Sequence, residues 1–589
     1  MTKNRISFFM MWFLIVFLIA GRVWKPNKNP ISWDTAGYYL YLPATFIYKD
    51  IRLKDYNRVD SLRNKYGFSD TFYQIYKSPK DGYYIKYTMG SAFLYSPFFA
   101  AGHVMAKLTG APADGFSRPY QNAMLIGCLL YAFLSILMMR KILLHFFSDK
   151  VTAFTMLCIV AGTNLYFILS MDNLQIHAVL FLLYSCLIWQ SIRFHSKPGY
   201  LNAALMGLFA GLIILTRPTD IVSWLIPIFW GVNSPSVLWE KIKSNFSYFL
   251  VFGIIAAGCF FPQMFYWKLS AGEWFFNSYN NAGEGLDLKS PHTIPFLFSY
   301  RKGWLVYTPM AIFCILGIFF ARKKKPALFF PLLVYFLLNL WLISSWTCWW
   351  YAGSFSSRAM VQSYAIMMIP LGFFIQWVFG QKKIIAITGR VILLLVVFLC
   401  GFQTWQYAEG ILKMDGMTKK FYWKSFCQTK QNPGNNKYLL RERYLTTDTI
   451  QTGEMFNIKF EKSWTDSLML DSATIFSTLY EDEYGLIAEK YFTFIRVEGM
   501  ILNMDSTNNN PVDLVRHMAY KGKLYGYNAK NISLGGNTWK PFKIDYILPE
   551  VRCHMDRVKV YFWLRGKARV YIKHLKLSVL EPASFPELE

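Results

Sequence analysis

Residues 6–20 read ISFFMMWFLIVFLIA, an unbroken apolar run that follows the basic residues Lys3 and Arg5. An apolar run of this kind is typical of a membrane-spanning helix. At an N-terminus it also resembles a cleaved signal peptide, but the many apolar runs that follow favour an uncleaved first span. The last of these, residues 391–401, reads VILLLVVFLCG. We therefore predict a polytopic α-helical membrane protein.

Composition and charge divide the chain near residue 406. Hydrophobic residues make up 54% of the 589 residues and aromatic residues 19%, both high for a soluble protein. Residues 1–406 hold 36 Lys and Arg against 14 Asp and Glu, a net charge of +22, whereas residues 407–589 carry +5. Because the basic excess belongs to the apolar part, it indicates topology signals and contact with anionic lipid, not nucleic-acid binding.

The basic clusters decide the predicted topology. The segment 91–108 is apolar enough to cross, but counting it would place every later basic loop, such as residues 322–325, outside. The positive-inside rule therefore predicts that this segment lies flat on the membrane. Eleven crossings follow, with the N-terminus inside, the C-terminus outside and long outer segments at 23–119, 268–303 and after about 407. Crossings after the first are predicted near 120–140, 151–170, 174–192, 200–216, 219–233, 246–267, 304–321, 327–345, 359–379 and 386–406.

An acid among aromatic residues stands in the first outer segment. Asp34 lies in the stretch WDTAGYYLYLP, residues 33–43, shortly after the first span. Burial against aromatic rings raises the pKa of a carboxylate into a range that suits a general base. The alternative is that Asp34 caps the N-terminus of a short helix.

Four basic residues are predicted near the same outer face. Lys86, in YYIKYTMG at 83–90, either extends to the membrane interface or binds a lipid phosphate. Arg301 and Arg358 begin spans on the outer side, where positive charge runs against the topology bias and indicates a local anion. Arg217 lies between two short spans and is a candidate functional residue unless it pairs with a nearby aspartate.

These groups together suit a phosphodiester sugar donor. A phosphate leaving group departs without a general acid when cations stabilise its charge, so one carboxylate suffices for a single inverting displacement. Asp172, a second acid on this side, positions the acceptor or the sugar, caps a helix or, like Asp220, pairs with Arg217. His177 beside it is either a pocket residue or a packed core histidine. No metal-ligand spacing appears, although Asp34 with Asp172 remains a weak candidate for a divalent ion.

The order of these elements resembles the GT-C superfamily, in particular bacterial relatives of protein O-mannosyltransferases and of lipid A aminoarabinose transferase. The resemblance covers roughly residues 6–406 and includes the first-loop acid and the lysine before a juxtamembrane helix. It implies a catalytic base at Asp34 and phosphate contacts at Lys86, Arg358 and, less directly, Arg301. Three motifs add to it: GTNL at 162–165, SYRKG at 299–303 and WWYAGSF at 349–355.

The chain departs from these relatives at two positions. Thr35 follows Asp34, where mannosyltransferases often place a second acid, and Tyr87 follows Lys86, where the aminoarabinose enzymes carry Lys-Pro-Pro. The sugar and the acceptor therefore stay open. The resemblance also implies a multi-pass protein of the bacterial inner membrane, with a cytoplasmic N-terminus and a periplasmic C-terminal domain.

Beyond residue 406 the composition turns polar. Residues 414–426 read MDGMTKKFYWKSF, which is typical of an interfacial helix, and 407–446 are predicted to form this helix and a linker. Short alternating strands in 447–589 predict an outer β-sandwich of the jelly-roll type. Trp539 and Trp563 either stack on sugar rings or pack in its core. The clearest predicted strands are 491–497, 558–563 and 570–573.

The predicted function is transfer of a hexosyl- or pentosyl-type sugar from a polyprenyl-phosphate donor to a lipid, glycan or protein acceptor, without a cofactor. A transporter or flippase of lipid-linked sugars is one alternative, which would show internal repeats and broken helices with polar residues at mid-membrane. A non-catalytic scaffold for the outer β-domain is the other, and it leaves the acid and the cations without a role. We expect the acceptor or sugar pocket to include Tyr38, Tyr39, His177 and Trp350.

Overall fold

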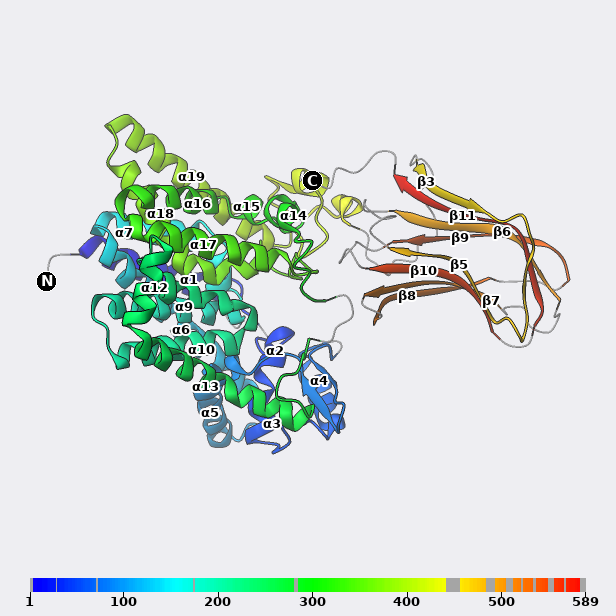
Figure 1. Cartoon of the computed structure of the whole chain (residues 1–589), viewed down its shortest axis with the longest axis horizontal. Helices are drawn as coiled ribbons and strands as arrows, with labels where there is room; N and C mark the ends of the chain where they lie inside the picture. Colours follow the sequence, from blue (N-terminus) through cyan, green and yellow to red (C-terminus); the bar gives the residue numbers. More distant parts are fainter. Residues whose placement is uncertain are drawn as a thin grey trace.

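The helices and the long strands of the protein form two separate bodies (Figure 1). The computed structural model describes residues 4–27, 29–69, 72–172, 175–279, 284–440, 456–483, 493–504, 512–520, 523–532, 537–548, 556–565 and 568–582. Between the two bodies the chain forms the short helices α20 (Lys419–Ser425) and η3 (Pro433–Tyr438). The first of these lies within the stretch predicted to be an interfacial helix.

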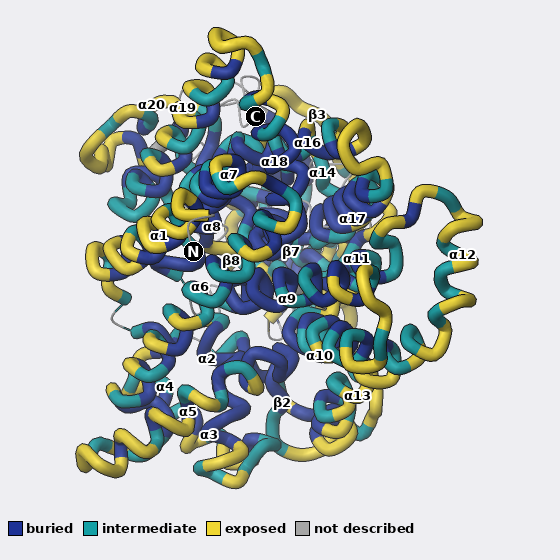
Figure 2. Tube along the Cα trace, turned by 90° about the vertical axis from the view of Figure 1, so that its left-hand side faces the viewer, coloured by how far each residue is buried: buried dark blue, intermediate teal, exposed yellow. Residues whose placement is uncertain are grey.

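Seven helices in the described residues are long and apolar enough to cross a membrane. α9 and α18 are almost wholly buried in the helical body, whereas α13 and α19 leave most of their apolar residues at least partly exposed (Figure 2). Because apolar helix faces are exposed favourably only to a nonpolar surrounding, this pattern indicates a membrane protein. The seven are α1 (Arg5–Trp24), α6 (Arg118–Phe146), α9 (Ile176–Ser196), α13 (Phe246–Ser270), α17 (Pro326–Ser344), η2 (Arg358–Ser363) with α18 (Tyr364–Phe379), and α19 (Lys383–Ala408).

Each of the eleven predicted crossings coincides with helical structure, but some are short or broken. The crossing at 151–170 is broken at Asn164, whose side chain donates hydrogen bonds to the carbonyls of Phe355 and Ser357. The crossing at 304–321 is broken just before Pro309. The number of true crossings therefore stays a prediction. The shorter helices are α7 (Asp149–Ala161), α8 (Leu165–Ser170), α10 (Tyr200–Thr216), η1 (Pro218–Trp224), α11 (Leu225–Phe229), α12 (Pro235–Ser244), α14 (Thr293–Phe298), α15 (Trp304–Tyr307) and α16 (Met310–Lys324).

The first outer segment folds against the end of the helical body that lies opposite the N-terminus (Figure 1). At the N-terminal end, the guanidinium of Arg140 donates hydrogen bonds to the carbonyl of Asn4 and the hydroxyl of Ser7. The segment predicted to lie flat forms α5, which packs against α6 and α10. Its orientation to a membrane stays a prediction. The outer segment contains α2 (Asp34–Tyr39), α3 (Tyr41–Phe46), α4 (Tyr56–Tyr66), β1 (Ile75–Lys77), β2 (Tyr83–Ile85) and α5 (Gly90–Thr109).

The C-terminal body is all-β, as predicted, and consists of two antiparallel sheets. The strand orders are β5-β10-β7-β8 and β3-β11-β6-β9, with β4 paired to β11. Val560 of β10 and Val579 of β11 are fully buried in one core shared by both sheets. The strands are β3 (Phe456–Ser463), β4 (Leu468–Leu470), β5 (Phe476–Glu483), β6 (Phe494–Asn503), β7 (Val512–Tyr520), β8 (Lys523–Ile532), β9 (Lys540–Ile547), β10 (Arg557–Leu564) and β11 (Val570–Pro582).

The predicted strands at 558–563 and 570–573 are confirmed, and the strand predicted at 491–497 begins outside the described residues. Trp563 points away from the core on β10, where buried positions alternate with partly exposed ones. It stacks on Phe476 at 5.9 Å between ring centroids. Trp539 lies under the ammonium of Lys573 at 4.2 Å. Neither tryptophan belongs to the described sandwich core.

Candidate active site

Asp34 and Arg358, which are 324 residues apart in the chain, form an ion pair between the first residues of α2 and η2. A guanidinium nitrogen (Nη2) of Arg358 donates a hydrogen bond to Oδ2 of Asp34 at 2.9 Å. The Asp34 side chain is 17% exposed and that of Arg358 is 14% exposed, so the pair is neither sealed nor fully solvated. Trp33, directly before Asp34, has a φ of 52°. A bulky residue rarely adopts this conformation, which marks strained backbone beside the acid.

Two tyrosines bind the other carboxylate oxygen of Asp34. Strands β1 and β2 pair with Ile75 opposite Ile85, and continuing this register places Tyr73 opposite Tyr87. The hydroxyls of Tyr73 and Tyr87 donate hydrogen bonds to Oδ1 of Asp34 at 2.8 and 2.7 Å. A short hairpin thus brings two donors, on residues fourteen positions apart, to one oxygen atom.

The prediction that burial raises the pKa of Asp34 is wrong in its net direction. Burial does act to raise this pKa, but the charge of Arg358, the hydrogen bonds from Tyr87 and Tyr73 and the charge of Lys86 together lower it below its ordinary value. A carboxylate that accepts several hydrogen bonds next to a cation favours its ionised form. Asp34 is therefore an anion at neutral pH and is able to accept a proton.

The alternative role of Asp34 as a helix cap does not fit the structure. Helix α2 begins at Asp34 itself, so the capping position belongs to Trp33, which makes no side-chain capping bond. The Asp34 carboxylate instead binds side chains from the hairpin and from η2.

Lys86 lies beside this pair but is held by another acid. Its ammonium makes an ion pair with Glu284 at 3.0 Å and lies 5.0 to 5.8 Å from the ring centroids of Tyr73, Tyr87 and Tyr279. The Lys86 side chain is only 5% exposed. It therefore does not extend into solvent at the interface, which was the alternative to phosphate binding.

The backbone before Arg358 is strained and fixed at several points. Tyr351, Ala352 and Ser356 all have positive φ values, which side-chain-bearing residues adopt at a cost. Asn164, of the GTNL motif, is fully buried. Its side chain donates hydrogen bonds to two carbonyls of this loop, those of Phe355 and Ser357. The motif thus acts from a distance by placing Arg358 at the start of η2.

Arg217 belongs to a neighbouring buried network. Its guanidinium lies 3.9 Å from Asp220, the predicted alternative partner, and 5.7 Å from the ring centroid of Tyr351. Asp220 accepts hydrogen bonds from Gln362, whose side-chain oxygen contacts His177 at 3.0 Å. His177 is 4% exposed, so it is a packed histidine within a polar chain. Arg217 therefore pairs with a nearby aspartate, Asp220, which was the alternative to a functional role.

Asp172 lies in the turn between α8 and α9, within electrostatic reach of Arg358, Arg22 and Asp34. Burial raises its pKa to about 7, and the charge of Asp34 adds to this effect, while the two arginines oppose it. In the described part of the chain, no side-chain capping bond from Asp172 to the start of α9 is present. The second predicted acid thus lies near the first one and titrates close to neutral pH.

Arg301 does not reach Asp34 in this structure. It makes two hydrogen bonds to Asp415, at 2.8 and 3.1 Å, and stacks on Trp350 at 3.8 Å. The next residue, Lys302, is 2% exposed and donates hydrogen bonds to the carbonyls of Ser354 and Met414. The SYRKG motif at 299–303 suggested a phosphate contact. In the structure it joins the loop that contains Trp350 to the residues that follow α19.

The aromatic residues predicted to line the acceptor or sugar pocket lie in different places. The ring of Tyr38 packs at a tilt against that of Tyr87, with 4.3 Å between ring centroids, and its electrostatic neighbours include Asp34, Arg358 and Arg217. Tyr39 points the other way, is fully buried, and donates a hydrogen bond to the carbonyl of Gly115. Trp350, beneath Arg301, is 6% exposed. Of the expected pocket residues, Tyr38 and His177 therefore lie near the acid, while Tyr39 and Trp350 pack elsewhere.

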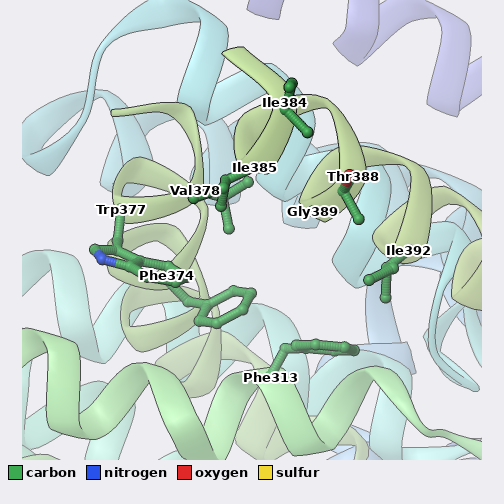
Figure 3. Close-up of a pocket in the computed structure, with 9 residues that line it drawn as sticks. All are labelled: Phe313, Phe374, Trp377, Val378, Ile384, Ile385, Thr388, Gly389 and Ile392. Carbon is green, nitrogen blue, oxygen red and sulfur yellow. The ribbon is translucent and has the colours of Figure 1, made fainter. Parts of the chain in front are cut away.

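An apolar pocket lies apart from these charges (Figure 3). Its volume is about 310 Å³, and residues of α16, α18 and α19 line it, including Phe313, Trp377 and Ile392. Its lining is almost wholly hydrocarbon, and two of its three helices, α18 and α19, are apolar enough to cross a membrane. It offers no group that acts on a proton or a phosphate.

Sequence reasoning did not assign a role to Tyr73, Tyr87, Tyr279 or Glu284. The turn-forming stretch SPKDG at 78–82 between two aromatic segments is the signal that predicts the hairpin and hence the two tyrosine donors. No group of three or more His, Cys, Asp or Glu side chains suited to a metal ion occurs among the described residues. No known protein-family model matches the chain, and no curated protein matches it significantly.

Proposed function

We propose that the protein is a membrane glycosyltransferase that uses a polyprenyl-phosphate sugar donor, with Asp34 as the general base. The observation that carries this proposal is the contact between Asp34 and Arg358, an ionised acid and a fixed cation held together on the outer side. Lys86 lies next to them and supplies a second cation. An acid and two cations are what an inverting displacement of a lipid phosphate requires.

The proposed reaction is a single displacement. The hydroxyl oxygen of the acceptor attacks the anomeric carbon of the sugar, and its proton passes to a carboxylate oxygen of Asp34. The bond between the anomeric carbon and the phosphate oxygen breaks at the same time. Its electron pair stays on the lipid phosphate, which Arg358 and Lys86 stabilise. The configuration at the anomeric carbon is therefore inverted.

Arg358 has donors to spare for this task. One nitrogen binds Asp34, and in the described residues its other N–H groups make no hydrogen bond. A guanidinium has five N–H donors in a planar fork, so it binds a carboxylate and a phosphate oxygen together. Tyr73 and Tyr87 hold the remaining carboxylate oxygen and so orient Asp34.

One observation favours a transporter or flippase as the second candidate. The helices are interrupted next to polar groups, at the buried Asn164 and at the partly exposed Arg217, which is a feature of membrane transporters. The scaffold alternative has no such support, because it gives no role to the ion pair.

The test uses purified protein in lipid nanodiscs with a panel of radiolabelled polyprenyl-phosphate sugars and an envelope extract as the source of acceptor. Asp34→Asn should lower transfer by roughly 10²- to 10⁴-fold, the range of general-base contributions, while donor binding persists. The matched control is Asp81→Asn, since Asp81 lies in the same outer segment and forms an exposed pair with Lys54.

Full transfer activity of Asp34→Asn would remove Asp34 from the chemistry. The two candidate functions also separate in proteoliposomes. Movement of labelled lipid between leaflets, without sugar transfer and without dependence on Asp34, would establish the transporter instead.

A further inference from the structure

The ammonium of Lys86 is enclosed by neutral rings and one anion. Three tyrosine rings surround it, and Glu284 supplies the negative charge at 3.0 Å. The two partners differ in exposure, because the Lys86 side chain is 5% exposed and that of Glu284 is 27% exposed. Lys86 is thus the buried member of the pair, and Glu284 is the more exposed one.

The backbone next to Glu284 is held firmly. Gly285 and Thr347 exchange two hydrogen bonds, of 3.0 and 2.9 Å. Leu286 pairs with Trp346 as an isolated antiparallel bridge. This strip of chain leads on to the strained loop before η2. These contacts fix the chain directly after Glu284, whose carboxylate lies against Lys86.

A carboxylate in this position competes with a phosphate. Both are oxygen anions that accept charge-assisted hydrogen bonds from one ammonium, and the low exposure of Lys86 strengthens each interaction. A phosphate that binds Lys86 must therefore displace Glu284, whose partial exposure gives it a route back to water. Tyr73 and Tyr87, which face both Lys86 and Asp34, keep the two sites adjacent.

We propose that Glu284 is an internal counter-ion that occupies the phosphate-binding ammonium of Lys86 and sets the affinity of the protein for lipid phosphate. This inference rests on the proposed function, since it takes Lys86 as a phosphate ligand. The carboxylate protects a buried cation until the lipid arrives, and exchange of one anion for the other keeps Lys86 paired at every stage.

The test measures binding of polyprenyl phosphate to full-length protein in nanodiscs, with the corresponding polyprenyl alcohol as the uncharged control. Glu284→Gln keeps the shape of the side chain and removes the competing charge. The dissociation constant should fall by roughly tenfold, the scale of a charge-assisted hydrogen bond. The matched control is Glu273→Gln, at an exposed position of the same outer segment, which should leave the affinity unchanged.

Thermal unfolding separates this role from a purely structural salt bridge. Glu284→Gln should lower Tm without lipid, because Lys86 loses its partner, and polyprenyl phosphate should restore it. The shift in Tm caused by the lipid should therefore be larger in the variant than in the parent protein. An equal shift in both, with an unchanged dissociation constant, would overturn the inference.

Lys86→Met distinguishes failure of the inference from failure of the proposed function. It should weaken the preference for phosphate over alcohol to the part that Arg358 provides, and Glu284→Gln added to it should have no further effect. If the parent protein itself binds the alcohol as tightly as the phosphate, the proposed function fails. If the parent prefers phosphate through Lys86 but Glu284→Gln does not bind it more tightly, only the counter-ion role is wrong.

Discussion

Two clusters of charge in the helical part of the chain look alike in sequence and differ in structure. In the first, Asp34 and Arg358 form a partly exposed pair whose remaining contacts are tyrosine hydroxyls. In the second, Arg301 is bound by Asp415 and Trp350, and Lys302 is buried against backbone carbonyls. A basic residue at the start of a span therefore has two uses. N–H donors that have no partner in the protein are free to bind a ligand. Donors that the protein itself satisfies have a structural role.

The largest expected effect belongs to the second cluster, that of Arg301 and Lys302. Burial lowers the pKa of Lys302 from 10.5 to about 7, and neighbouring Arg301 adds to this. Between these two pH values the unfolded chain binds a proton that the folded chain does not, so Lys302 makes stability rise with pH. The rise amounts to several kcal/mol at about 1.4 kcal/mol per pKa unit. Unfolding free energies of the parent and of Lys302→Met from pH 7 to 10 measure it, and an identical pH dependence in both would mean that Lys302 stays charged.

A substitution in the first cluster, that of Asp34 and Arg358, should change the affinity for the donor. Arg358→Ala should weaken binding of the donor by roughly 1.5–3 kcal/mol, the scale of a charged hydrogen bond, because it removes a phosphate ligand. It should also raise the pKa of Asp34, since Arg358 is the strongest of the influences that lower it. Arg301→Ala is the matched control and should reduce stability while donor affinity is unchanged. Equal losses of affinity in the two variants would erase the distinction between the clusters.

The smallest effect concerns Asp172, which lies within electrostatic reach of Arg358 and whose pKa burial raises to about 7. As pH rises from 6 to 8, Asp172 becomes an anion that attracts the same cation as the donor phosphate. Donor affinity should fall by about fivefold, on the order of 1 kcal/mol for a screened charge. Isothermal titration should show this fall in the parent protein and a flat profile in Asp172→Asn. A slope that persists in Asp172→Asn but vanishes in Lys302→Met would assign it to the lysine.

The candidate site was predictable from the sequence only where the local sequence was enough to suggest a role for a residue. Asp34 and Arg358 were both identified from the sequence, and the structure places them in contact. The tyrosine donors were missed because their position depends on the register of a hairpin, although the turn sequence between its strands was visible. Arg301 was assigned to the phosphate because its actual partner, Asp415, lies 114 residues further along the chain.

The C-terminal domain shows the same division. The alternation of apolar and polar residues predicted strands, and the structure has them in two sheets. The described strands mostly alternate between the two sheets along the chain, and the jelly-roll type stays a prediction. The side to which each tryptophan points was not predictable, because a one-residue change of register moves a side chain to the other face. Trp563 lies on the outer face of its sheet.

The sequence by itself determined that this chain has long apolar helices followed by an all-β domain, because hydropathy and alternation are properties of short stretches. Only the tertiary structure decided which cation faces Asp34, which acid holds Lys86 and in which direction the pKa of Asp34 moves. These outcomes depend on contacts between residues up to 324 positions apart. A charge is controlled by whatever lies within a few ångströms of it, and the fold sets that distance.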